Sequence, residues 1–391
     1  MPSWDARRGW RAGCSACRVR SGCWPMPGSR HARAAATRGR RRRPIAGHMT
    51  AIDGGALRAT ALALAVGAAG AGIFHLIGFP AAFLTGPAVA VTLAGLAGLP
   101  VLVPAVLRDA CFLMIGINIG AGVTRDLLGA ALSWPLSFVL LTATLTGGLV
   151  VCRRLLIRRF GFDRASALLA ATPGHLSYVL SLSADTRTDI ERIAVVQSMR
   201  VLFLTLLVPV LLTFWDVHGN SPAVAAPRLM APTALIALGA AGAAVGAIFR
   251  RLGVPAAFLL AGMLVSALGQ VSALSEGAPP QGLTLSAFVV MGTLIGTRFR
   301  GQSRGTLRRS VHAGLTATLV ASAFAVLGAI IAARLMDAPV ALLLISFAPG
   351  GVEAMAAMAV QIEVDATFVA AHHVMRLVIL TFLVPFLMGR G

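Results

Sequence analysis

Lysine is absent from this chain of 391 residues, tyrosine occurs once, and Asp and Glu together number only 14. All 34 basic residues are therefore arginine, which is typical of a GC-rich coding sequence, so an arginine here need not have been selected over a lysine. Charged residues make up 12% of the chain, hydrophobic residues make up 57%, and the mean hydropathy is +0.82. This scarcity of charge excludes an ordinary soluble domain.

Cysteine is also scarce, and its five positions form no disulfide framework. Cys14, Cys17 and Cys23 lie in a basic N-terminal extension, where the second half of a four-ligand zinc site is incomplete. Cys111 and Cys152 fall within apolar runs and are interpreted as small core residues. We therefore expect no metal site and no cofactor.

What the chain does contain is a series of apolar runs of membrane-spanning length, from Leu57 to the C-terminus. Backbone groups in the bilayer must bond within their own segment, and the runs lack the alternation of strands, so they are expected to be helices. The sequence predicts an all-α polytopic membrane protein. The candidate helices are 57–77, 79–99, 102–123, 133–152, 162–183, 190–214, 231–249, 254–274, 283–299, 311–335, 338–360 and 366–388.

Much of this sequence occurs twice, about 175 residues apart. The segment 189–212 matches 365–388 without a gap, and 10 of 24 positions are identical. Three shorter motifs recur in the same order: Pro80-Ala81-Ala82-Phe83-Leu84 as Pro255-Ala256-Ala257-Phe258-Leu259, Gly116 and Gly120 as Gly292 and Gly296, and Pro173-Gly174 as Pro349-Gly350. A duplication that carries prolines, glycines and arginines through apolar segments is typical of a membrane transporter.

The duplication predicts a simple domain organisation. We expect a basic extension over 1–48, a first membrane repeat over 49–214, a linker over 215–230 and a second membrane repeat over 231–391. Each repeat should contain five or six membrane helices, one of them broken.

The arginine-rich loops 153–164 and 298–309 bear on the orientation of the two halves. If all twelve candidate helices cross the membrane, these loops fall on opposite sides, against the positive-inside tendency. If the segments that begin at Pro80 and Pro255 are re-entrant, ten spans remain and both loops share the cytoplasmic side. Each half then has an odd number of crossings, so we favour repeats that are inverted relative to each other.

The basic extension has three interpretations, since residues 1–43 hold 12 arginines and one acid. It could be an arm for nucleic acid or anionic lipid, or a targeting peptide that lacks the apolar stretch of a secretory signal. The interpretation that we favour is that translation starts at Met49 and that the extension is spurious or disordered.

Taken together and in order, these motifs make residues 55–390 resemble the AbrB-type membrane proteins of Gram-negative bacteria. The resemblance implies a duplicated hydrophobic module in the inner membrane, and it brings the label of a regulator of gene expression, or in some members of ammonia monooxygenase. Family members commonly carry Pro-Gly-Gly with an acidic residue nearby. The second half keeps this pattern up to Glu353, whereas the first half has His175 after Pro173-Gly174, so the halves are no longer chemically equivalent.

The paired Pro-Gly steps are the first candidates for a site. Proline removes a backbone donor and clashes with the preceding turn, so Pro173-Gly174 and Pro349-Gly350 should each break a helix. Backbone groups freed at membrane depth must find protein, water or a ligand. We favour a substrate site over a purely structural kink, because the break recurs at equivalent places.

Charged residues near these breaks are the next candidates. A buried Glu353 could carry a proton or bind a cation, or it could form a structural ion pair with Arg200 or Arg376. Arg200 and Arg376 occupy matched positions, and each could capture a carboxylate or phosphate or lock two helices together. Both choices stay open.

The other polar residues have structural as well as functional interpretations. Asp189 and Asp365 begin helices and should cap them. His175 could shuttle protons or bond at a helix end, and Asn118 could bind substrate or a neighbouring helix. The adjacent pair His372 and His373 should point about 100° apart and so cannot easily share one ion. The glycines spaced four apart are expected to serve close helix packing.

We therefore expect a secondary transporter or exporter of a small solute, with anions among the candidates. The alternative is a membrane-bound regulator of gene expression that acts indirectly, because no DNA-binding module is recognisable and direct nucleic-acid binding is not expected. Ammonia monooxygenase is disfavoured, since the histidines are scattered, and no enzymatic activity is expected. The expected partners are the lipid bilayer, a small molecule or ion, and further copies of the chain.

Overall fold

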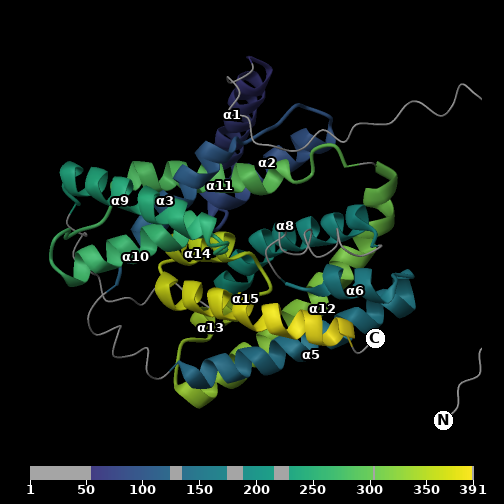
Figure 1. Cartoon of the computed structure of the whole chain (residues 1–391). Coiled ribbons are helices and arrows are strands. Elements are labelled where there is room, and N and C mark those ends of the chain that lie inside the picture. Colours follow the sequence, from purple (N-terminus) through teal and green to yellow (C-terminus); the bar gives the residue numbers. More distant parts are fainter. Residues whose placement is uncertain (1–53, 124–133, 174–187, 215–228, 303, 390–391) are drawn as a thin grey trace, which may run out of the picture. The chain divides into compact units, whose positions relative to one another are not determined.

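The computed structural model describes residues 54–123, 134–173, 188–214, 229–302 and 304–389. This part is built from thirteen helices and contains no strand, only one isolated bridge between Leu229 and Ala278 (Figure 1). The prediction of an all-α membrane protein is confirmed. Six of the described helices are long and apolar enough to cross a membrane: α1 (Gly54–Leu76), α5 (Pro135–Phe160), α8 (Ile190–Phe214), α9 (Pro232–Arg251), α12 (Arg304–Met336) and α15 (Ala366–Gly389).

Four further apolar helices are shorter: α2 (Ala82–Leu96), α3 (Ala105–Ala121), α10 (Ala257–Val271) and α11 (Gln281–Thr297). The 15 residues of α2 or α10 make a rod of about 22 Å, which is less than the ~30 Å of a bilayer core. Each of these two helices follows an alanine with positive φ, 53° at Ala81 and 51° at Ala256. Their shortness agrees with segments that do not fully cross, and the number of crossings stays a prediction.

Two helices are longer than their apolar runs. α5 continues to Phe160 where the sequence predicts an end at 152, and α12 begins at Arg304 where the sequence predicts 311. The extra turns carry arginines, which are good helix formers and can project beyond the apolar part of the helix. The hydropathy pattern alone therefore underestimates both helices.

The second Pro-Gly step breaks its helix as predicted. α13 (Val340–Phe347) ends just before Pro349, and α14 (Val352–Gln361) begins just after Gly350. In the first half, α6 (Arg164–Ala171) ends just before Pro173. Gly174 and His175 lie outside the described residues.

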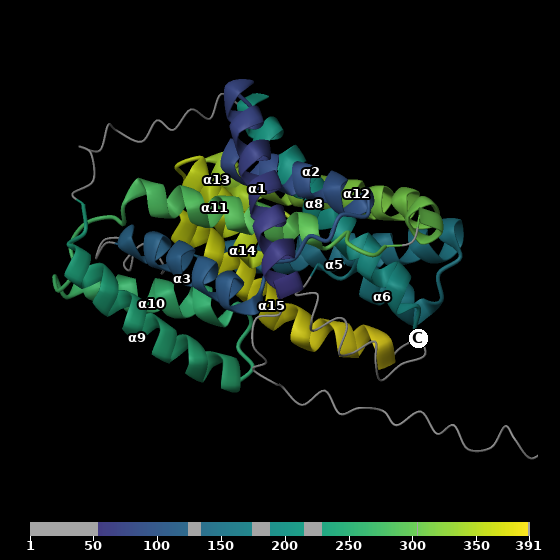
Figure 2. The ribbon, with the colours of Figure 1, turned by 90° about the horizontal axis from the view of Figure 1, so that it is seen from above.

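The described helices fall into two groups by their contacts. Helices α1, α2, α3, α9, α10 and α11 pack chiefly against one another and are called the crossing bundle (Figure 2). Helices α5, α6, α8, α12, α13, α14 and α15 do the same and are called the broken-helix bundle. The groups meet where α8 packs on α2 and α11, and where α3 packs on α14 and α15.

Contacts within each bundle come in corresponding pairs. In the crossing bundle, α1 packs on α2 as α9 packs on α10, and α3 packs on α10 as α11 packs on α2. In the broken-helix bundle, α5 packs on α6 as α12 packs on α13, and α6 packs on α8 as α13 packs on α15. Each bundle therefore draws equivalent helices from both halves of the sequence.

The motif glycines place helices in backbone contact, as their spacing predicts. A Cβ added at Gly116 on α3 would lie 2.1 Å from the carbonyl oxygen of Leu259 on α10. A Cβ added at Gly292 on α11 would lie 2.3 Å from the carbonyl oxygen of Leu84 on α2. Leu84 and Leu259 close the two copies of the Pro-Ala-Ala-Phe-Leu motif. The glycine motif of each half therefore contacts the Pro-Ala-Ala-Phe-Leu motif of the other half.

Candidate functional site between two helix breaks

Arg376 on α15 holds the end of the second broken helix. Its side chain is only 1% exposed. Nη1 donates to the carbonyl oxygen of Ala348, the C-cap of α13, over 2.6 Å, and Nη2 donates to the carbonyl oxygen of Gly350. Carbonyls at a helix C-terminus lack partners within the helix and carry partial negative charge, so a buried guanidinium is well matched to them.

Arg200 on α8 does the same in the first half. Its Nη1 lies 3.2 Å from the carbonyl oxygen of Thr172, the C-cap of α6, and 3.4 Å from that of Ala171. Its Nη2 donates to the side-chain oxygen of Gln197. Arg200 and Thr172 each stand 176 residues before Arg376 and Ala348, so the two contacts are equivalent.

A second pair of side chains extends this correspondence. Gln197 donates from Nε2 to the carbonyl oxygens of Leu169, at 2.8 Å, and Thr172, at 2.9 Å. His373, at the matched position, bonds through Nε2 to the carbonyl oxygen of Ile345 at 3.0 Å. Sequence reasoning missed Gln197. Its alignment with His373 at the constant offset of 176 was the available signal.

These contacts bear on the two roles left open for the arginines. Both arginines bond to carbonyls at helix ends, Arg200 at the end of α6 and Arg376 at the end of α13, which is the lock between helices. Capture of an anion is a separate role, and it requires donors that reach an open space.

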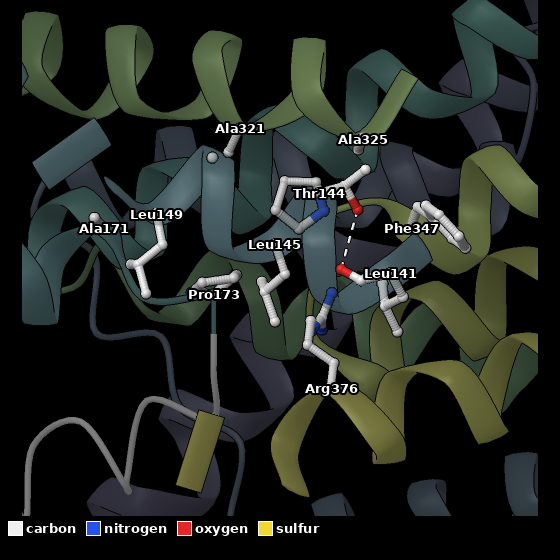
Figure 3. Close-up of a pocket in the computed structure, with 12 residues that line it drawn as sticks. Leu141, Thr144, Leu145, Leu149, Ala171, Pro173, Ala321, Ala325, Phe347 and Arg376 are labelled. Carbon is white, nitrogen blue, oxygen red and sulfur yellow. Dashed lines mark hydrogen bonds between the residues drawn. The ribbon is translucent and has the colours of Figure 1, made fainter. Parts of the chain in front are cut away.

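Such a space lies between the two breaks (Figure 3). A pocket with an empty volume of about 380 Å³ is lined by α5, α12, the two helix ends and Arg376. Most of its lining forms pairs at the offset of 176: Leu145 with Ala321, Leu149 with Ala325, Ala171 with Phe347, and Pro173 with Pro349. The remaining lining residues are Leu141, Thr144, Gly148 and Arg376.

The two matched arginines do not both line this pocket. Arg376 lines the pocket, and its Nε is buried without a hydrogen-bond partner in the described structure. Arg200 is not part of the lining. The described lining therefore draws matched positions from both halves, but the paired residues differ in size and the charged side chain comes from the second half.

Glu353 lies near the second break, in the first turn of α14. It is 6% exposed, and its charge interacts with those of Arg376 and Arg298. An interaction with Arg376 agrees with the partner that the sequence suggested. A carboxylate near a helix N-terminus is also stabilised by the helix dipole. Glu353 is not part of the pocket lining.

The remaining predicted residues take other positions. Asp365 accepts from the backbone N–H groups of Thr367 and Phe368, and Asp189 accepts from that of Arg192, so both cap helices as expected. Asn118 lies half-buried on α3 and does not line the pocket.

The two adjacent histidines have different partners. His372 bonds to Ser137 Oγ through Nε2, at 2.6 Å, and to the carbonyl oxygen of Phe368 through Nδ1, whereas His373 bonds to Ile345. The two rings therefore have different partners, which agrees with the expectation that they point in different directions. Among the described residues, no cluster of three or more His, Cys, Asp or Glu side chains could hold a metal ion.

Long apolar helices, with a pocket between the ends of α6 and α13, define an α-helical membrane protein of the multi-span class. A family model described as "Transition state regulatory protein AbrB" matches residues 83–390, and the chain belongs to this family. The resemblance found from the motifs is thereby confirmed.

Two relatives were found by comparison with known proteins. The chain is similar to "Putative regulator AbrB" of Escherichia coli (strain K12), with 26% identity over 342 residues, which cover 84% of this chain and 93% of that protein. It is also similar to "Uncharacterized protein YhjN" of Bacillus subtilis (strain 168), with 27% identity over 245 residues. That match covers 57% of this chain and 62% of YhjN, so less than two thirds of that relative is spanned.

Proposed function

We propose that this protein is a secondary transporter or exporter of a small solute in the inner membrane, and that it has no enzymatic activity. The observation that carries the proposal is the pocket between the two broken helices, with Arg376 buried in its wall. Transporters that use broken helices bind their solutes where two internal repeats meet, close to the freed backbone groups. The matched pairs in the lining support such a meeting point for this pocket.

The proposal includes an inverted duplication over 49–214 and 231–391. The paired helix contacts support a duplication, and so do the equivalent bonds of Arg200 and Arg376. Two inverted repeats give a transporter two conformations of similar energy, which open to opposite sides of the membrane. The limited contact of α8, α14 and α15 with the crossing bundle supports a movement of one bundle against the other.

The direct test is transport by the purified full chain in proteoliposomes. Radiolabelled solutes should exchange across the vesicle membrane, and a proton or sodium gradient should drive this exchange. Exchange should collapse in Arg200→Ala and Glu353→Gln, because these changes remove a brace of a broken helix and a buried charge. Transport at the wild-type rate in both variants would remove these residues from the mechanism.

A regulatory role is the second candidate, and the name of the Escherichia coli relative favours it. Because the described part of the chain is a bundle of apolar helices, we propose that any effect on gene expression is indirect. Deletion of residues 1–48 separates the two functions. Loss of regulation with unchanged transport would favour a regulatory arm, and unchanged regulation would favour a transported signal.

A further inference from the structure

Among the described residues, the walls of the pocket are almost entirely apolar. Its lining includes leucines, alanines, two prolines, a glycine and a phenylalanine, and its polar side chains are Thr144 and Arg376. Thr144 already donates its hydroxyl proton to the carbonyl oxygens of Leu140 and Leu141, at 2.9 and 3.0 Å. Its oxygen can accept a further hydrogen bond but cannot donate one to an anion. Arg376 is therefore the donor that the described part of the lining offers.

Arg376 has further N–H donors that its bonds to the helix end do not use. A guanidinium has five N–H donors, and the bonds to Ala348 and Gly350 use one on Nη1 and one on Nη2. The Nε–H has no partner in the described structure, although the side chain is 99% buried. A buried N–H of a charged group that lacks a partner is costly, so the site favours an acceptor from a ligand. Figure 3 shows the guanidinium directed into the pocket, toward Leu141 and Thr144.

The apolar walls favour a ligand with a single negative charge. Arg200 and Glu353 both act on Arg376 electrostatically, the arginine more strongly than the carboxylate. The carbonyl of Ala348 at the end of α13 accepts a hydrogen bond from one N–H group of Arg376. Arg200 cannot supply a second positive contact in this conformation, because it does not line the pocket. A dianion or a phosphate would leave charged oxygens against leucine and proline, where desolvation is costly. A carboxylate with an apolar body satisfies both the donor and the walls.

We infer that the pocket binds a small monocarboxylate with an aliphatic or aromatic body, with the carboxylate on Arg376 and the body against Leu141, Leu145 and Phe347. The inference rests on the proposed transport function and names its substrate class. The leucines, alanines and phenylalanine of the described lining provide the apolar contacts for such a body.

Binding to the purified full chain in detergent tests the inference without transport. The probes are isovalerate and phenylacetate, with phenylethanol as the neutral analogue and with succinate and inorganic phosphate as anions of other classes. A ligand that binds the folded protein raises its melting temperature in proportion to the logarithm of its concentration. We expect saturable stabilisation by the two monocarboxylates and none by phenylethanol, succinate or phosphate. Stabilisation by succinate or phosphate instead would overturn the inference.

A variant at Arg376 identifies the anion contact. Arg376→Lys keeps the charge but loses the planar fork and the Nε donor, so phenylacetate binding should weaken about tenfold or more. Arg334→Lys on α12 is the matched control, because Arg334 is exposed and lies outside the pocket lining. If Arg376→Lys fails to fold, competition by phenylacetate against modification of the wild-type protein with phenylglyoxal gives the same information. Equal binding by Arg376→Lys and wild type, or no protection from phenylglyoxal, would contradict the assignment.

The transport assay separates this inference from the function on which it rests. Monocarboxylate binding without exchange of any probe in proteoliposomes would leave the inference standing and remove the transporter. Exchange of another solute class without monocarboxylate binding would leave the transporter standing and overturn the inference.

Discussion

Arg376 and Ala348 are joined across the second helix break, where Nη1 of the arginine donates to the carbonyl oxygen that ends α13 over 2.6 Å. Arg200 and Thr172 form the equivalent contact at the end of α6. A cation at a helix C-terminus stabilises it by roughly 0.3–1 kcal/mol, and by up to ~2 kcal/mol where the pair is buried. The breaks are therefore stabilised from within the protein and do not require a ligand to exist.

Removal of either arginine should destabilise the protein. In Arg200→Met or Arg376→Met the carbonyls at the helix end lose their charged donor. Gln197 still donates to Thr172, and the backbone N–H of Gly350 still donates to Ala348. The cost is about 1–3 kcal/mol for each carbonyl that is left without a partner. Thermal unfolding in detergent measures the loss. Arg334→Met, at an exposed position on α12, should stay within about 0.5 kcal/mol of wild type. Unchanged unfolding of both buried variants would show that water or other groups bind these carbonyls.

The glycine contacts predict a second set of destabilised variants. Gly116→Ala and Gly292→Ala place a methyl group 2.1 and 2.3 Å from carbonyl oxygens of the facing helices, so those helices must move apart. Overpacking of this kind costs about 1–3 kcal/mol. Gly239→Ala on α9 is the control, because its methyl group meets nothing within 4 Å and alanine is the better helix former. Wild-type stability in Gly116→Ala would contradict the close crossing of α3 and α10.

Asp163 should make stability depend on pH in the acid range. Burial opposes its ionisation, but hydrogen bonds from the side chain and backbone of Ser166 outweigh this and lower the pKa of Asp163. A lowered pKa in the folded state means that this stabilisation is present above the unfolded value near ~3.9 and is lost as the pH falls through the folded value.

The variant Asp163→Asn isolates this contribution. Asparagine keeps the cap on α6 but cannot titrate, so the acid loss of melting temperature should be shallower than in wild type. Asp163→Ala should lose about 0.5–1 kcal/mol at neutral pH, toward the lower end for caps because the side chain is exposed. Identical pH profiles for wild type and Asp163→Asn would show that Asp163 does not titrate with folding.

Inversion of the two halves predicts where matched loops lie. A cysteine placed at position 126 should face the opposite side of the membrane from a cysteine at position 302, whereas twelve full crossings place both on one side. The native cysteines must be replaced first, although Cys111 and Cys152 are buried. Labelling of intact cells and inverted vesicles with an impermeant maleimide reads out the side. Equal labelling of both positions from one side would exclude inversion.

The sequence predicted the framework of the protein well, because that framework depends on local rules. Long apolar runs give helices, Pro349-Gly350 must interrupt one, and Gly116 permits a close crossing. The sequence could not decide between the two roles of Arg200 and Arg376. That choice depends on which carbonyls lie within reach, and this is a property of tertiary packing.

The pocket itself could not be predicted for a similar reason. Leu145 and Leu149 are ordinary in an apolar helix, and so are Ala321 and Ala325. Their role as pocket lining becomes clear only from the structure, in which α5 packs on α12 and both helices line the same space. Gln197 was overlooked because a single amide in a helix carries no distinct signal until the helix end that it binds is known.

The difference between these leucines and alanines gives the last prediction. On α12 the pocket is lined by Ala321 and Ala325, where α5 has the larger Leu145 and Leu149. The double variant Ala321→Leu/Ala325→Leu makes the lining more symmetric and should fill the pocket. Leucine is the residue already present at the matched positions, so the helix should accept it, and the two added side chains occupy the space of a ligand.

We expect this variant to fold and to lose both the stabilisation by phenylacetate and solute exchange in proteoliposomes. Ala323→Leu is the control, since Ala323 is exposed on the same helix and lies outside the lining. It should bind and exchange like wild type. Retained exchange in the double variant, at wild-type rate, would mean that the solute takes another route through the protein. Loss of exchange in Ala323→Leu as well would point to a general effect of bulk on α12.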